Sequence, residues 1–183
     1  MINRMIAYGL AAGLLTGGNL FVTLLLWRGE DVGSSGAIIG YTVMLLAFAA
    51  IFVAVKRQRD VAGGGVIGFW PALALGLGIS AVAGIVYTLA WEAGLAVTGI
   101  DFGGDYARAT IAARRAAGAS AAELAKLTAE MNAFRASYAN PLIRLPMTFA
   151  EIFPVGVVVS LVAAALLRNP RFLPARRADA RQS

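Results

Sequence analysis

Apolar residues dominate four long stretches of the chain, and short clusters of charged residues separate them. Three of these stretches carry no charged residue and cover 5–27, 32–55 and 61–91. Each exceeds the roughly 20 helical residues, at about 1.5 Å per residue, that cross the hydrocarbon core of a bilayer. The fourth, 152–167, reaches that length only if 145–151, with Glu151, is included. The pattern predicts membrane-spanning helices at about 5–27, 37–55, 70–97 and 146–167.

A hydrophilic segment of 98–144 separates the third predicted span from the fourth. Within it, Ser120 and Glu123 have the spacing of a capping box. An apolar stripe then recurs at intervals of three and four residues, through Leu124, Leu127, Met131, Phe134 and Tyr138. We therefore predict an all-α fold: a four-transmembrane-helix bundle with an extramembrane αα-hairpin, at about 105–139, between helices three and four. The stripe either packs on the hairpin's own helices or lipid headgroups, or it binds a partner.

Positive charges distinguish the two sides of this predicted bundle. The N-terminal segment, the loop after the second span and the C-terminal tail together carry nine Lys and Arg residues against two acids, Asp60 and Asp179. By the positive-inside rule both termini face the cytoplasm, which predicts a multi-pass membrane protein. Residues 1–168 form the expected membrane domain. Residues 169–183 form a basic tail that we expect to be disordered and close to anionic lipid.

Composition narrows the chemistry available to the chain. Apolar residues make up 59% and charged residues only 14%, against about a quarter in a soluble domain. There is no cysteine and no histidine, which excludes disulfides, thiolate nucleophiles, Cys/His zinc sites and imidazole acid–base catalysis. We predict no cofactor and no metal site. The net charge of +6 lies where membrane topology places it, so we predict no nucleic-acid partner.

Small residues recur every four positions in two of the predicted helices. They are Gly9, Gly13 and Gly17 in the first helix and Gly76, Ser80 and Gly84 in the third. Such spacing lets two helices approach closely in lipid. We predict that the first helix packs against the third; the alternative is that these faces form a homodimer.

Two acids lie inside predicted spans, where desolvation makes a carboxylate costly and each is a functional candidate. Glu92 lies near the outer end of the third helix and Glu151 near the outer end of the fourth, with Thr148 one turn before it. If the two carboxyls face each other, they form a candidate site that shares a proton, holds a cation or supplies an acid and a base. The structural alternative is that each glutamate pairs with an arginine, such as Arg144, or accepts hydrogen bonds from Tyr and Thr.

Several segments resemble the bacterial membrane family catalogued as domain of unknown function 4199. They are Gly40-Tyr41-Thr42, Tyr87 to Trp91, Gly118-Ala119-Ser120, Glu130-Met131, Phe134, Tyr138, Asn140-Pro141-Leu142 and, most specific of all, Met147 to Gly156. The resemblance runs from about Arg4 to Arg168 and implies a small inner-membrane protein with four spans. No activity is assigned to that family, so it implies no functional residue.

Three functions therefore stay open. The first is a structural or accessory membrane subunit without enzymatic activity, whose hairpin faces a partner and whose glycine faces form an oligomer. The second is a proton- or cation-coupled transporter or channel subunit that uses Glu92 and Glu151. The third is a membrane enzyme that acts on lipid, which the absence of His and Cys disfavours.

Overall fold

The structure, a computed structural model, describes residues 1–26 and 33–174 and is helical throughout its regular elements. Four helices are long and apolar enough to cross a membrane: α1 (Ile2–Leu26), α2 (Gly33–Arg57), α3 (Phe69–Thr98) and α6 (Pro141–Leu167). A π-helical turn, η1 (Gln58–Ala62), continues α2. Two shorter helices, α4 (Phe102–Ala116) and α5 (Ala121–Tyr138), follow α3. The predicted all-α class, with four helices long and apolar enough to cross a membrane, is therefore confirmed.

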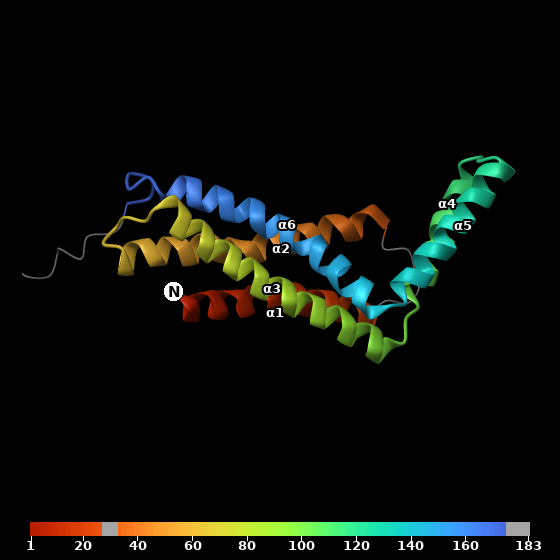
Figure 1. Ribbon diagram of the computed structural model, residues 1–183, viewed down its shortest axis with the longest axis horizontal. Helices are drawn as coiled ribbons and strands as arrows, with labels where there is room; N and C mark the ends of the chain where they lie inside the picture. Colours follow the sequence, from red (N-terminus) through yellow and green to blue (C-terminus); the bar gives the residue numbers. More distant parts are fainter. Residues whose placement is uncertain (27–32, 175–183) are drawn as a thin grey trace, which may run out of the picture.

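The four long helices run side by side, and α4 and α5 project from one end of them (Figure 1). At that end, the arm end, α3 finishes and α6 begins. At the opposite end lie the N-terminus of α1, η1 and the C-terminus of α6 (Figure 1); we call it the basic end. We call α4 and α5 together the arm.

Helix α6 begins earlier than predicted, at Pro141 instead of near residue 146. The Asn140 side chain caps it by accepting a hydrogen bond from the Leu142 N–H at 3.0 Å, and proline is well suited to a first helical position because it lacks an N–H. The helix then continues through Pro146 and Pro154. This early start brings Arg144 onto α6, where it contacts α3.

Close contact between α1 and α3 depends on the three glycines of α1. A Cβ atom added to Gly9 would lie 2.6 Å from the Val82 Cβ, and one added to Gly13 would lie 2.6 Å from the Val86 Cβ. At Gly17 the corresponding distance to the Ala90 Cβ is 2.9 Å. Because no real side chain fits at such distances, these glycines allow the two helices to touch.

Gly76, Ser80 and Gly84 of α3 face α6, not α1. A Cβ on Gly76 would lie 2.6 Å from the Ser160 Oγ, and a Cβ on Gly84 would lie 2.6 Å from a ring carbon of Phe149. The contact is reciprocal, since a Cβ on Gly156 of α6 would lie 2.6 Å from the Ser80 Cβ. Helix α3 is the most buried of the four long helices. It therefore needs one close-packing face for α1 and a second for α6.

The first residues after α6 are held at the basic end. Arg59 of η1 is fully buried, and its guanidinium donates to the carbonyls of Phe172, at 2.8 Å, and Leu173, at 2.5 Å. The Phe172 ring packs edge-on against Phe52 of α2, with centroids 6.3 Å apart. Residues 169–174 thus differ from the disorder expected for the whole tail, because a buried arginine holds their carbonyls. Residues 175–183 lie outside the described residues.

Candidate functional site

The charged centre of the arm end is an ion pair between α3 and α6. Arg144 donates from Nε to the Glu92 Oε1 at 2.7 Å and from Nη2 to Oε2 at 2.5 Å. The pair is bidentate, and the two side chains are only 15% and 24% exposed. Such a fork-to-carboxylate geometry is the strong form of a charge-assisted hydrogen bond. Of the two alternatives for Glu92, the structure therefore shows the one in which an arginine pairs with the carboxylate.

Arg144 also connects the ion pair to the base of the arm. Its Nη1 donates to the Tyr138 carbonyl at 3.2 Å, and its guanidinium carbon lies 5.7 Å from the centre of the Tyr138 ring. The Tyr138 hydroxyl in turn accepts a hydrogen bond from Trp91 Nε1 at 2.9 Å. Burial raises the pKa of Tyr138 to about 12, although the Trp91 hydrogen bond acts in the opposite direction. Tyr138 therefore stays neutral.

Aromatic rings extend this connection into the arm. Trp91 and Phe102 meet edge-on with centroids 4.9 Å apart, and Phe102 lies 5.6 Å from Tyr138. Further out, Tyr106 of α4 lies 5.5 Å from Phe134 of α5. Aromatic pairs at these distances contribute about 0.5–1.5 kcal/mol beyond their buried area. Phe134 and Tyr138, the last two residues of the apolar stripe predicted on α5, thus pack on α4 and on the end of α3.

The outer rim of this junction is Asp101, the N-cap of α4. Its Oδ1 accepts the Gly104 N–H at 3.0 Å, and its Oδ2 accepts from Arg135 Nη2 at 2.6 Å. The Gly104 N–H and the Arg135 charge hold the pKa of the Asp101 carboxyl below its ordinary value. Between this rim and Arg144 lies a cavity of 230 Å³.

Glu151 has a different environment from Glu92. It lies on the exposed side of α6, and the side chain of Tyr87 of α3 lies near its carboxyl. Among residues 1–26 and 33–174, no Lys or Arg forms an ion pair with Glu151. An acid inside a span without a cationic partner is the more unusual of the two.

Two of the three predicted site residues, Thr148 and Glu92, bond to Arg144, whereas Glu151 does not. Thr148 is buried and donates its hydroxyl to the Arg144 carbonyl of its own helix at 3.1 Å. Glu92 is occupied by Arg144, and the two glutamate carboxyls share no hydrogen bond. These contacts do not join the two carboxyls, and the shared-proton site stays a prediction. Nor does the described part of the chain gather three His, Cys, Asp or Glu side chains into a group suited to a metal ion.

Two groups of residues were missed by sequence reasoning. The Trp91–Tyr138 hydrogen bond joins residues 47 positions apart, and no local pattern marks it. The Gly156 and Ser160 pair repeats the four-residue spacing that was recognised at Gly76 and Ser80, so the signal was present in the sequence.

Together these features define a multi-pass membrane protein of four helices, with a helical arm fastened to one end by an ion pair and an aromatic cluster. Over residues 7–169 the chain matches the family model described as Protein of unknown function (DUF4199). The chain belongs to this family, which confirms the resemblance of its sequence. Neither a curated protein nor a solved structure matches it.

Proposed function

We propose that this protein is a structural or accessory subunit of the bacterial inner membrane, without enzymatic activity, in which the four helices carry the arm as an extramembrane αα-hairpin for a partner. The basic end would face the cytoplasm. Of the described residues there, Arg4, Lys56, Arg57, Arg59, Arg168 and Arg171 are basic, and Asp60 is acidic. The positive-inside rule then places the arm on the outer side.

The observation that carries this proposal is the surface of the arm. Its aromatic residues pack on each other and on Trp91, and Tyr106 is also partly exposed. Its exposed positions are mostly alanines and charged residues of both signs. Such a surface suits water and a polar partner, and it does not suit burial in hydrocarbon. The partner is a second copy of the chain or another membrane protein.

The side of the membrane is tested by single cysteines, since the natural chain has none. Ala125 on α5 and Arg171 at the basic end are both exposed. We expect a membrane-impermeant maleimide added to intact spheroplasts to label Ala125→Cys. Arg171→Cys should react only after the membrane is permeabilised. The opposite pattern would place the arm in the cytoplasm and overturn the topology.

The partner is tested by a photo-crosslinking amino acid placed at position 125, with a matched probe at the exposed Leu46 of α2. We expect a discrete protein adduct from position 125, and we expect it to weaken when Arg114→Glu and Arg115→Glu reverse the charge of α4. An adduct of twice the chain mass indicates a homo-oligomer, and any other mass indicates a different subunit. If position 125 yields no protein adduct, the arm does not serve as a docking hairpin.

A second candidate function is proton or cation coupling, which the environment of Glu151 favours. Glu92 does not qualify for this role because Arg144 neutralises it. In proteoliposomes, a pH-dependent flux that Glu151→Gln abolishes, and that Glu130→Gln on the exposed arm leaves unchanged, would support coupling. Equal flux in wild type and Glu151→Gln would exclude it.

A further inference from the structure

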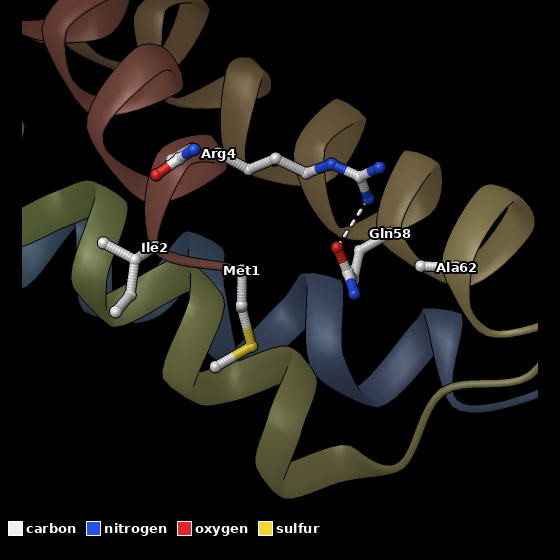
Figure 2. Close-up of a pocket in the computed structure, with 6 residues that line it drawn as sticks. Met1, Ile2, Arg4, Gln58 and Ala62 are labelled. Atoms are coloured by element: carbon white, nitrogen blue, oxygen red, sulfur yellow. Dashed lines mark hydrogen bonds between the residues drawn. The ribbon is translucent and has the colours of Figure 1, made fainter.

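A cavity opens at the basic end between the first turn of α1 and η1. Its volume is 570 Å³, and it is lined by Met1, Ile2, Asn3, Arg4, Gln58 and Ala62 (Figure 2). The candidate spans begin at Ile2 and end at Ala62 on these two elements. If these helices cross a bilayer over those lengths, the cavity lies where the hydrocarbon core meets the phosphate groups of the lipids.

Arg4 is the cation of this cavity, and Gln58 positions it. Arg4 Nη1 donates to the Gln58 Oε1 at 2.5 Å, from α1 across to η1 (Figure 2). In the described part of the chain no carboxylate pairs with Arg4, and its Nε and Nη2 have no hydrogen-bond acceptor. Two donors of a planar fork are thus free for a phosphate, whose geometry the guanidinium matches.

The surroundings of the cavity strengthen its preference for an anion. Asp60, the acid of η1, is already paired with Lys56 and Arg59. Arg57, Arg168 and Arg171 have no carboxylate partner among residues 1–26 and 33–174. This end therefore carries an excess of positive charge that attracts anionic headgroups.

We infer that this cavity is a binding site for the phosphate of an anionic phospholipid, held by the free side of the Arg4 fork. The apolar half of the lining, Met1, Ile2 and Ala62, would contact the first carbons of the acyl chains, and Asn3 would face the headgroup. A soluble phosphate ester offers no acyl carbon for these apolar residues. The inference needs only the membrane-embedded bundle and does not depend on the arm or its partner.

The test measures lipid binding to the purified full chain in non-ionic detergent, by native mass spectrometry during titration with phosphatidylglycerol. Arg4→Gln removes the fork, and Arg57→Gln is its matched control, because it removes the same charge from an exposed side chain of the same end that does not line the cavity. We expect Arg4→Gln to weaken binding about tenfold and Arg57→Gln less than about twofold. Equal weakening by both variants would show only diffuse attraction and would overturn the site.

Two further measurements test the same site independently. Ala62→Trp fills the cavity without changing charge, and it should weaken binding as Arg4→Gln does; unchanged binding in Ala62→Trp would contradict the cavity, even if Arg4→Gln fails to fold. Glycerol phosphate, added in excess, should leave the bound lipid in place. If glycerol phosphate displaces the lipid at comparable concentration, the site belongs to a soluble phosphate ester and the lipid assignment is wrong.

Discussion

The interior of the bundle and the base of the arm are held together by opposite kinds of contact. Between the long helices, glycines bring backbones together, and the hydroxyls of Ser80 and Ser160 donate to their own helices, to the carbonyls of Gly76 and Gly156. At the base of the arm, one guanidinium holds a carboxylate and a carbonyl. In lipid, helix association depends on shape and packing, so errors of shape weaken the bundle gradually. At the arm, loss of one partner leaves a charge unpaired.

The largest loss of stability is expected at Arg144, the guanidinium that holds the base of the arm. Arg144→Met keeps the length of the side chain but leaves the Glu92 carboxylate without its counter-ion. Removal of one partner of a largely buried pair costs about 3 kcal/mol. Unfolding in mixed micelles with increasing dodecyl sulfate measures this loss. The double variant Glu92→Met with Arg144→Met should recover most of the stability, because neither charge then remains.

Arg135 offers a matched control for this prediction. Its ion pair with Asp101 is 56% and 49% exposed, and exposed pairs contribute about 0–1 kcal/mol. Arg135→Met should therefore destabilise much less than Arg144→Met. Similar losses of stability in the two variants would show that burial does not increase the contribution of the Arg144 pair. The base of the arm would then not depend on a buried charge.

The second-largest loss of stability is expected in the packed interior, where two glycines of α1 can be compared. A Cβ on Gly13 would lie 3.1 Å from the backbone of Ala83, whereas a Cβ on Gly18 meets nothing within 4 Å. Gly13→Ala should cost about 1–3 kcal/mol by forcing α1 away from α3. Gly18→Ala should be neutral or slightly stabilising, because alanine favours a helix. The same dodecyl sulfate titration compares them, and equal midpoints would refute the close contact of α1 with α3.

The sequence allowed much of the fold to be predicted and little of the site. Uninterrupted apolar length marks a span whatever its neighbours are, so the four helices could be predicted from local pattern alone. The glycines of α1 were also recognisable, but nothing local shows that α3 turns Gly76 and Gly84 toward α6. That choice depends on three-dimensional packing around the most buried helix.

The two acids inside the long helices show more clearly what the sequence could not predict. Glu92 and Glu151 look alike in sequence, since both are single acids near one end of an apolar helix. Their surroundings differ because α6 begins at Pro141, which places Arg144 beside Glu92 and not beside Glu151. A shift of a few residues in a helix start thus decides which acid is paired.

The smallest effect is a pH dependence at the outer rim of the arm base. The pKa of Asp101 is lower in the folded protein than the ordinary 3.8, chiefly because of the Gly104 N–H and then Arg135. A lowered pKa contributes stability that is present above 3.8 and is lost as the pH falls through the folded value. The arm should therefore loosen only in strong acid, and by less than about 1 kcal/mol for so exposed a pair.

Spin labels on two exposed positions, 117 directly after α4 and 89 in α3, measure this loosening as a broader distance distribution in frozen samples. Asp101→Asn is the sharpest comparison, because asparagine keeps the N-cap acceptor but cannot titrate. The distribution of this variant should not change between pH 6 and strong acid, the two conditions of the experiment. If the variant broadens in acid as wild type does, the Asp101 carboxyl does not control the arm.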